Sequence, residues 1–393
     1  MLAKAQTVKQ DIIQLRRAIH QHPELGYQEC NTANLIIDQL KTLKIPFKTG
    51  CAKTGVVAEL SYGTGPTILV RADMDALPIQ ENTGLEFQSK IPNVMHACGH
   101  DTHTAMLMGA IRLLSTENFC GTLRFLFQPA EENNYDDPDG LSGAQRIIEE
   151  GHIDDIDAAI ALHQMPTMPT GTIAITNGSV MAAADFFEIE ITGKASHAGV
   201  CPEKGIDAIV IASELILSLQ SIVSRQTNPT DTAVISVSTI NGGTAANIVA
   251  DKVKLSGTLR ALKETTRNTL LSLIQSRCDA FAKMHHTKIR FHVYYGVPVT
   301  ENDSAITQIA HTSAISIFGE QNVRNDLTIM GGEDFGYIAN KVPSCFALLG
   351  TRVTDGEAYP LHSPNMIVNE NALPMGAAFL AQTALDLLNE LSN

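Results

Sequence analysis

Residues 123–132 read Leu-Arg-Phe-Leu-Phe-Gln-Pro-Ala-Glu-Glu, and this stretch does most to define the fold and its active edge. A strand-like, largely apolar run ends in two adjacent carboxylates, Glu131 and Glu132. The run Thr-Ile-Leu-Val-Arg-Ala-Asp-Met-Asp at residues 67–75 also ends in carboxylates, and the run at residues 158–163 ends in a histidine. Ligand-binding groups collect at the carboxyl edge of an open α/β sheet. We therefore expect these side chains to meet there.

The first part of the chain alternates between strand-like and helix-like segments. Its apolar spacing predicts helices at residues 8–20, 29–43, 101–114 and 143–150, and strands at residues 55–60, 67–71, 123–127 and 158–162. Either Asp101 or Thr102 is expected to cap the third helix. Such alternation indicates an α/β fold with a mainly parallel sheet and helices on both faces.

The pattern changes near residue 180 and returns near Pro298. Between these points it predicts the order β-α-β-β-α-β, which is typical of a ferredoxin-like domain. The length of 393 residues also favours two domains. We predict a discontinuous catalytic domain of residues 1–182 and 296–393, and an inserted α+β domain of residues 183–295.

Composition excludes several classes of partner. The chain has 28 lysine and arginine residues against 42 acidic ones, a net charge of -14, so it has no electrostatic footprint for nucleic acid or an anionic membrane. No uninterrupted apolar run approaches the ~18 residues of a membrane span. Seven irregularly spaced cysteines argue against a disulfide framework, and the N-terminus lacks an apolar signal core. These features predict a cytoplasmic protein.

Residues 95–103, Met-His-Ala-Cys-Gly-His-Asp-Thr-His, form the densest cluster of potential metal ligands. The glycine lets the Cys98 thiolate and the His100 imidazole converge, and a thiolate can bridge two metals. A hydrolytic site also needs an open position for water. In an extended chain Glu131 and Glu132 would point to opposite sides, so that one holds metal and the other acts as base.

Each candidate also has an ordinary structural explanation. The two glutamates suit a solvated acidic pair, Cys98 a buried cysteine, and His163 a hydrogen-bonded core histidine. His362 lies in a polar Leu-His-Ser-Pro turn and is a surface residue by default. Metal-binding histidines usually donate their second N–H to a carboxylate, which is the role we favour for Asp75. The role of Asp73 stays open.

These segments together resemble the M20 metallopeptidase family, in its amidohydrolase branch of hippurate hydrolases, aminoacylases, N-acetyldiaminopimelate deacetylases and auxin-conjugate hydrolases. The resemblance runs nearly end to end through ordered motifs, at residues 17–26, 71–78, 96–101, 127–132, 196–198, 242–247, 257–260, 331–335 and 362–364. It implies a two-metal site with Glu131 as general base. The implied metal ligands are Cys98, His100, Glu132, His163 and His362.

The resemblance also implies roles for the inserted domain, as a lid and as the surface of a homodimer or higher homo-oligomer. His197 matches the position that polarises the scissile carbonyl. Asn247, Arg260 and Gly332 match substrate-binding positions, and an arginine fork suits a free carboxylate.

The chain departs from the family pattern in two places. The polar loop 133–140 replaces a glycine-rich link, which points to an unusual substrate preference. Residues 198–203, Ala-Gly-Val-Cys-Pro-Glu, lack a second histidine common in relatives.

The predicted function is metal-dependent hydrolysis of the amide bond of N-acyl amino acids, with metal-activated water, Glu131 as base, and Asp75 and His197 assisting. Two divalent ions are expected, zinc or manganese, with cobalt or nickel possible. A dipeptidase or aminopeptidase of the same family, a non-catalytic metal-binding protein, and an amidase with Cys98 as nucleophile are the alternatives.

Overall fold

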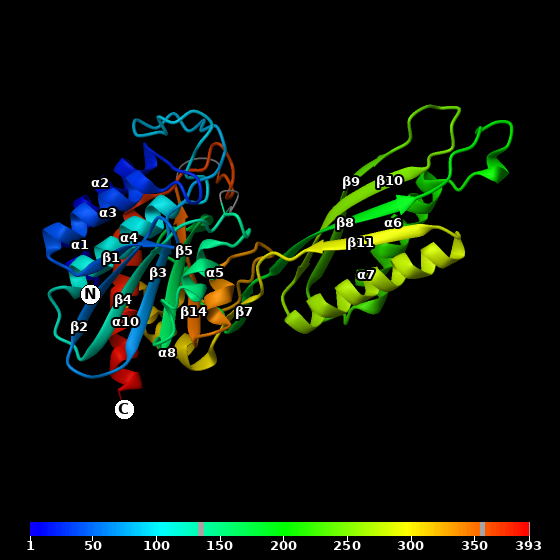
Figure 1. The fold of residues 1–393 in the computed structure, drawn as a ribbon. Helices are drawn as coiled ribbons and strands as arrows, with labels where there is room; N and C mark the ends of the chain where they lie inside the picture. Colours follow the sequence, from blue (N-terminus) through cyan, green and yellow to red (C-terminus); the bar gives the residue numbers. More distant parts are fainter. Residues whose placement is uncertain (133–136, 354–357, 393) are drawn as a thin grey trace. The chain divides into compact units, whose positions relative to one another are not determined.

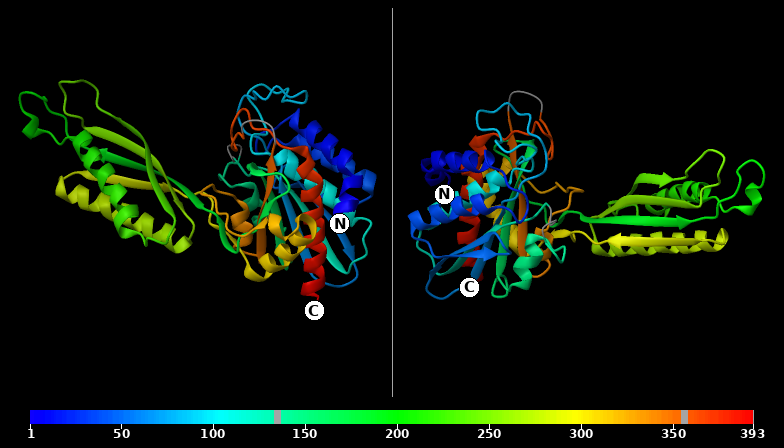
Figure 2. Two further views of the ribbon diagram at one scale, coloured as in Figure 1. Left: turned by 180° about the vertical axis from the view of Figure 1, so that it is seen from behind. Right: turned by 45° about the horizontal axis from the view of Figure 1, so that its top comes forward.

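The computed structural model describes residues 1–132, 137–353 and 358–392 (Figures 1 and 2). The chain divides into two compact units. The first comprises Met1–Val180, Glu301–Thr328 and Asp334–Asn393, and the second comprises Met181–Thr300 and Ile329–Glu333. The sequence-based boundaries at 183 and 295 lie close to the main insertion. The short return of residues 329–333 to the second unit was not anticipated.

The first unit is built on an eight-stranded sheet of order β1-β2-β4-β3-β5-β14-β6-β13. Four neighbouring pairs are parallel, β3 with β4, β3 with β5, β5 with β14 and β6 with β13, and three are antiparallel. The strands are β1 (Phe47–Cys51), β2 (Gly55–Tyr62), β3 (Thr67–Asp73), β4 (Gly121–Gln128), β5 (Ala158–Pro169), β6 (Ile173–Ala174), β13 (Val323–Arg324) and β14 (Ser344–Arg352).

Helices cover this sheet and bury its central strands. In β3 every residue after Thr67 is buried, as expected for a parallel strand covered on both faces. The helices are α1 (Leu2–Thr7), α2 (Lys9–His20), α3 (Cys30–Leu43), α4 (His100–Leu114), α5 (Gly143–Glu149), α8 (Ser304–Phe318), α9 (Phe335–Ala339) and α10 (Leu373–Leu391). The predicted α/β class with a mainly parallel sheet is confirmed.

The second unit has an antiparallel sheet of order β11-β8-β10-β9 with two helices, the ferredoxin-like arrangement predicted from the sequence. Its elements are β8 (Ala183–Thr192), α6 (Ala208–Gln226), β9 (Ala233–Gly242), β10 (Lys252–Ala261), α7 (Glu264–Met284) and β11 (Lys288–Tyr294). Strands β7 (Gly178–Met181) and β12 (Thr300–Asn302) pair where the chain leaves and re-enters the first unit.

Helix α6 bears on the expectation that the chain has no apolar run long enough to span a membrane. Among the described helices it alone is long and apolar enough, by length and composition, to cross a membrane. One side of α6, including Ile211, Leu215 and Leu219, is buried in the core of the second unit. The core helix of a globular unit passes the same length-and-composition test.

The start of α4 differs from the prediction. Its N-cap is Gly99, at φ 88°, and Asp101 and Thr102 lie inside the first turn. Only glycine adopts this left-handed conformation without strain. A Cβ at position 99 would also lie 2.6 Å from the Gln164 side-chain nitrogen. This bend makes His100 the first residue of the helix.

Candidate metal centre

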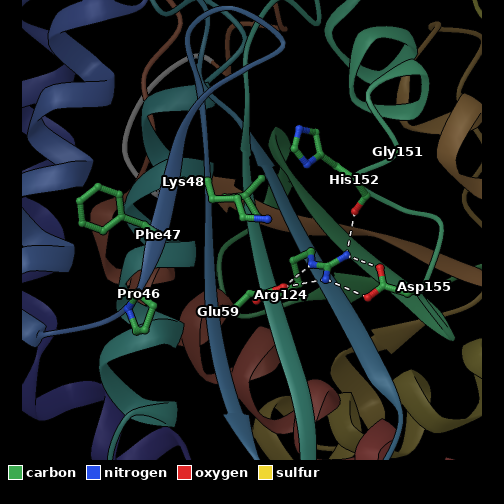
Figure 3. A pocket seen from close by; sticks show the side chains of 9 residues that line it. Pro46, Phe47, Lys48, Glu59, Arg124, Gly151, His152 and Asp155 are labelled. Carbon is green, nitrogen blue, oxygen red and sulfur yellow. Dashed lines mark hydrogen bonds and ion pairs between the residues drawn. The ribbon is translucent and has the colours of Figure 1, made fainter.

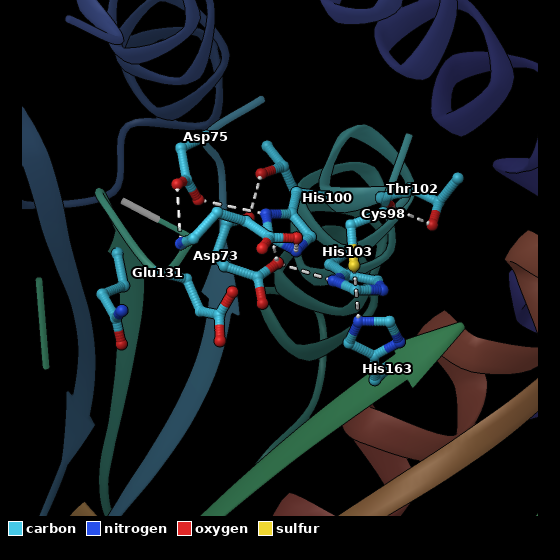
Figure 4. A network of polar contacts seen from close by, with 12 residues as sticks. Asp73, Asp75, Cys98, His100, Thr102, His103, Glu131 and His163 are labelled. Carbon is cyan, nitrogen blue, oxygen red and sulfur yellow. Dashed lines mark hydrogen bonds and ion pairs between the residues drawn. The ribbon is translucent and has the colours of Figure 1, made fainter. Parts of the chain in front are cut away.

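Three predicted ligands lie together where α4 begins and β5 passes it. Cys98, His100 and His163 are buried, and their ligand atoms lie within 4.8 Å of one another (Figure 4). The Cys98 Sγ is 3.3 Å from His163 Nε2. Because His163 Nδ1 lies 2.6 Å from the Gln164 carbonyl, it is the nitrogen that carries the proton. The His163 Nε2 lone pair is therefore free for a metal.

A second donor group overlaps the first. Cys98, Glu132 and His362 also place their ligand atoms within 4.8 Å, and so do His100, Glu131 and Glu132. His362 Nε2 is 2.9 Å from Glu132 Oε1, although half of the His362 side chain is exposed. The structure thus brings all five predicted ligands into one connected cluster, with Cys98 common to two donor groups.

The glutamate pair is not carried on an extended chain as expected. Strand β4 ends at Gln128, and Ala130 has φ 50°, which bends the backbone. Glu131 and Glu132 therefore converge on His100 instead of pointing to opposite sides. The assumption of alternating side-chain directions was wrong because the strand ends before the pair begins.

Asp75 connects His100 to the glutamate pair. Its Oδ1 accepts from His100 Nδ1 at 3.1 Å, and its Oδ2 accepts from the Glu132 backbone N–H at 3.0 Å. His100 Nε2 is buried and has no hydrogen-bond partner among the described residues. With Nδ1 held by Asp75, Nε2 is the nitrogen presented to the cluster.

The electrostatics of the cluster fit a cation. Burial lowers the pKa of His100, but Asp73, Asp75 and Glu132 raise it more, to about 10. Burial, Glu132 and Glu131 raise the pKa of the Cys98 thiol well above its usual range. Bound divalent cations reverse both tendencies, because they stabilise a thiolate and require an imidazole lone pair. The donor set of sulfur, imidazole and carboxylate suits zinc and related ions.

Comparison with known proteins identifies the family of this chain. The model of Peptidase family M20/M25/M40 matches residues 69–386. The chain belongs to this family. It is an M20-type hydrolase of amide bonds.

Relatives and solved structures align with almost the whole length of this chain. An N-acetyl-L-cysteine deacetylase of Bacillus subtilis is 39% identical, covering 98% of this chain and 89% of its own. A hippurate hydrolase of Campylobacter jejuni is 38% identical, covering 95% and 96%. The YXEP protein of Bacillus subtilis, described as a dinuclear metal-binding peptidase of the M20 family, has a TM-score of 0.85, 32% identity and coverage of 98% and 99%.

Asp73, whose role the sequence left open, lies between His100 and His103, with its Oδ1 3.8 Å from His100 Nδ1. It accepts from His103 Nδ1 at 2.6 Å and from Arg71 Nη1 at 2.7 Å. His103 Nε2 in turn accepts from the Gln164 backbone N–H at 2.8 Å. The ligand atoms of Asp73, His100 and His103 also lie within 4.8 Å of one another. Because both His103 nitrogens are already hydrogen-bonded, we assign Asp73 and His103 a supporting role.

Asp334 is a supporting residue that was not predicted from the sequence to belong to the site. Asp334, within the Gly-Gly-Glu-Asp motif, accepts from Arg71, Gln128 and the Ala144 N–H. The Asp334 N–H donates to Glu131 Oε1 at 3.3 Å. Its place within the motif at residues 331–335 was the only sequence signal, since its partners come from distant segments.

The predicted substrate residues all lie in the second unit. His197 is exposed, and its Nδ1 accepts from the N–H groups of residues 199 and 200, each at 3.2 Å. A β-bridge joins His197 to Ile248, and the Ala198 N–H donates to the Asn247 carbonyl at 3.0 Å. His197 and Asn247 are therefore neighbours.

Arg260 and Gly332 form another neighbouring pair in this unit. The Arg260 Nε donates to Thr258 at 3.2 Å, and burial lowers the pKa of the Arg260 guanidinium. A Cβ at position 332 would lie 3.5 Å from Arg260 Nη1 and 2.9 Å from the Ala184 Cβ. Glycine at this position leaves the space beside the guanidinium open. Of the loop 133–140, residues 133–136 lie outside the described structure, so its predicted effect on specificity stays a prediction.

A separate cavity of about 230 Å³ lies beside β1, β2 and β4 (Figure 3). Arg124 lines it and is engaged by Glu59, Asp155 and the His152 carbonyl. None of its lining residues belongs to the donor cluster. We therefore assign it no part in the reaction.

Removing divalent metal should lower the thermal stability of the protein, and restoring zinc or manganese should raise it. A ligand that binds only the folded state at 100 times its Kd stabilises by about 2.7 kcal/mol. Calorimetry of chelated and reloaded protein measures this shift. Cys98→Ala should abolish it and Cys120→Ala, at an exposed cysteine, should retain it; an unchanged shift in Cys98→Ala would contradict the assignment.

Proposed function

We propose that this enzyme hydrolyses N-acyl amino acids to a carboxylic acid and a free amino acid. The observation that carries the proposal is a carboxylate, Glu131, beside a donor cluster that is complete without it. Relatives named for N-acetylcysteine and hippurate act on this class of amide. Both names denote an acyl group on the nitrogen of an amino acid.

The cluster would hold two divalent ions through Cys98, His100, Glu132, His163 and His362. When bound, such ions polarise a carbonyl and lower the pKa of water from 15.7 to roughly 7. Zinc or manganese suits these donors, and cobalt and nickel are compatible with them.

Glu131 is the proton carrier in this proposal. It accepts a proton from the attacking water, and it returns that proton to the nitrogen of the leaving amine as the amide bond breaks. Asp75 accepts hydrogen bonds from His100 Nδ1 and from the Glu132 N–H. These two bonds keep both metal ligands in place while the proton is transferred. A general base must lie within hydrogen-bond reach of the proton it removes.

Residues of the second unit would bind the substrate. Because His197 Nδ1 accepts from the backbone, the neutral ring carries its proton on Nε2, which suits donation to a carbonyl oxygen. Arg260 has no ion-pair partner among the described residues, and we assign it the free carboxylate of the amino acid. Asn247 and Gly332 complete this contact surface.

The alternatives fit less well. Cys98 is a poor nucleophile here, because its sulfur lies among the donors and burial raises the pKa of its thiol. Family membership excludes the non-catalytic metal-binding protein. A dipeptidase or aminopeptidase shares the same metal chemistry and differs in requiring a free α-amine.

Glu131→Gln should lower kcat by about 10²–10⁴-fold while leaving the metal content unchanged, because it removes the proton carrier and keeps the carbonyl oxygen. Steady-state kinetics and elemental analysis measure the two effects. The exposed Glu390→Gln variant is the control. Wild-type turnover by Glu131→Gln would remove this residue from the reaction.

The substrate class is tested by comparing N-acetyl and N-benzoyl amino acids with dipeptides that carry a free amine. We expect turnover of the blocked substrates only. Arg260→Ala should raise KM for an N-acyl amino acid at least tenfold, about 1.4 kcal/mol. It should leave KM for the corresponding C-terminal amide unchanged, because that substrate lacks the carboxylate. Preference for free amines would favour the dipeptidase.

We also propose a homodimer formed through the second unit. Apolar side chains are exposed on α6 and near the edge strand β9, among them Leu217, Ile240 and Ile248. Unpaired strand edges and apolar patches are surfaces that proteins cover. Leu217→Glu should convert a dimer to a monomer in sedimentation equilibrium, and Met284→Glu, on α7, should not. A monomeric wild type would contradict the proposal.

We also propose that the protein resides in a reducing compartment such as the cytoplasm. All seven cysteines are free thiols, and two of them, Cys30 and Cys120, are exposed. Such thiols persist where glutathione and thioredoxin keep them reduced.

A further inference from the structure

Glu29 is a buried carboxylate that the mechanism has not used. It occupies the N-cap position of α3, yet its side chain makes no capping bond to that helix. Instead Oε1 accepts from the Ala130 N–H at 2.9 Å, and Oε2 accepts from the Thr54 hydroxyl at 2.6 Å. The carboxylate is therefore directed at the residue immediately before the glutamate pair.

Ala130 is the bend that aims the pair. It is fully buried and has φ 50°, a left-handed conformation that alanine adopts only when its surroundings impose it. Its carbonyl accepts from the Gly143 N–H at 2.9 Å, and a Cβ on Gly143 would lie 1.7 Å from the Pro129 oxygen. The backbone of Ala130 is thus held on both sides by distant parts of the chain.

The other side of Glu131 is held in the same way. The Glu132 N–H donates to Asp75 Oδ2 at 3.0 Å. Two buried carboxylates therefore accept the N–H groups directly before and directly after Glu131. Asp75 also contacts the ligand His100, whereas the Glu29 carboxylate bonds to Ala130 and Thr54, neither of which is a metal ligand.

We propose that Glu29 is a positioning residue that fixes the bend at Ala130 and so aims Glu131 at the reacting amide. The inference rests on the proposed role of Glu131. Stability alone gives a poor account of this carboxylate, because burial and the nearby Asp75 raise the pKa of Glu29 to about 7. The ionised form of Glu29 is therefore less favourable than that of an exposed glutamate, yet its carboxyl group supplies the acceptor that the Ala130 N–H needs.

The test compares Glu29→Ala, which removes the acceptor, with Glu29→Gln, which keeps a carbonyl oxygen. Glu29→Ala should lower kcat about 10–100-fold, since a 1 Å misplacement can cost 10²-fold. KM and metal content should stay within twofold of wild type. Glu29→Gln should retain at least half of wild-type kcat. The amide proton of Ala130 should exchange faster in Glu29→Ala, by NMR, and at the wild-type rate in Glu29→Gln.

Glu150 provides a matched control. Its Oε2 accepts from the N–H of Ala52 at 2.8 Å, and Ala52 is also buried and left-handed, with φ 45°. The same bond is therefore present at a bend that carries no glutamate pair. Glu150→Ala should leave kcat within twofold of wild type.

A second perturbation covers the case in which Glu29→Ala does not fold. Thr54→Val removes the hydroxyl that orients Glu29, and it should lower kcat several-fold, whereas Thr54→Ser should not. Ala130→Gly in the Glu29→Ala background should recover part of kcat, because glycine adopts positive φ without strain.

The inference is overturned if Glu29→Ala keeps wild-type kcat, if Glu29→Gln loses as much as Glu29→Ala, or if Glu150→Ala loses as much. It is also overturned if metal content falls in place of kcat. Each kcat is expressed relative to that of the wild-type enzyme, measured on an amide that the wild-type enzyme hydrolyses. Failure of the substrate proposal would appear earlier, as absent wild-type turnover of N-acyl amino acids.

Discussion

The structure depends on keeping ionisable side chains together, away from water, at the carboxyl edge of one sheet. Cys98, His100 and His163 are buried together, and Glu132 lies within reach of Cys98 and His100. Asp75 accepts a hydrogen bond from His100, and Asp73 accepts one from His103. Buried charge is tolerated only when it is paired or bound to metal. In this cluster the hydrogen bonds from the histidines pair the buried aspartates, and a bound cation would pair the remaining donors.

The backbone bends sharply at two positions to bring these ionisable side chains together. Gly99 and Ala130 both have positive φ, and each directly precedes a key residue of the site, His100 in one case and Glu131 in the other. Sharp bends at strand and helix ends bring side chains from separate elements to one point. The strain at Ala130 is held by bonds to Glu29 and Gly143, far apart in the chain. Strain of this kind collects at functional sites.

The division into two units separates two tasks. The first unit carries the predicted metal ligands and Glu131, and the second carries His197, Asn247, Arg260 and Gly332. In the proposed function the metal ligands of the first unit would serve any amide substrate, whereas residues of the second unit would contact the carbonyl and the carboxylate of a particular substrate.

Local signals in the sequence were enough to predict the fold class, the ferredoxin-like insertion and a metal site at the strand ends, because periodicity and strand-end polarity are read from neighbouring residues. The full set of five ligands, with His362 among them, followed only from the resemblance to the M20 family. The sequence-based prediction failed at Asp101, which does not cap α4, and at the glutamate pair, which is not extended. It also gave no sign that Glu29 reaches Ala130, 101 residues away. These features could be seen only in the folded protein, because a bend with positive φ and its buried acceptor depend on which distant segments pack together.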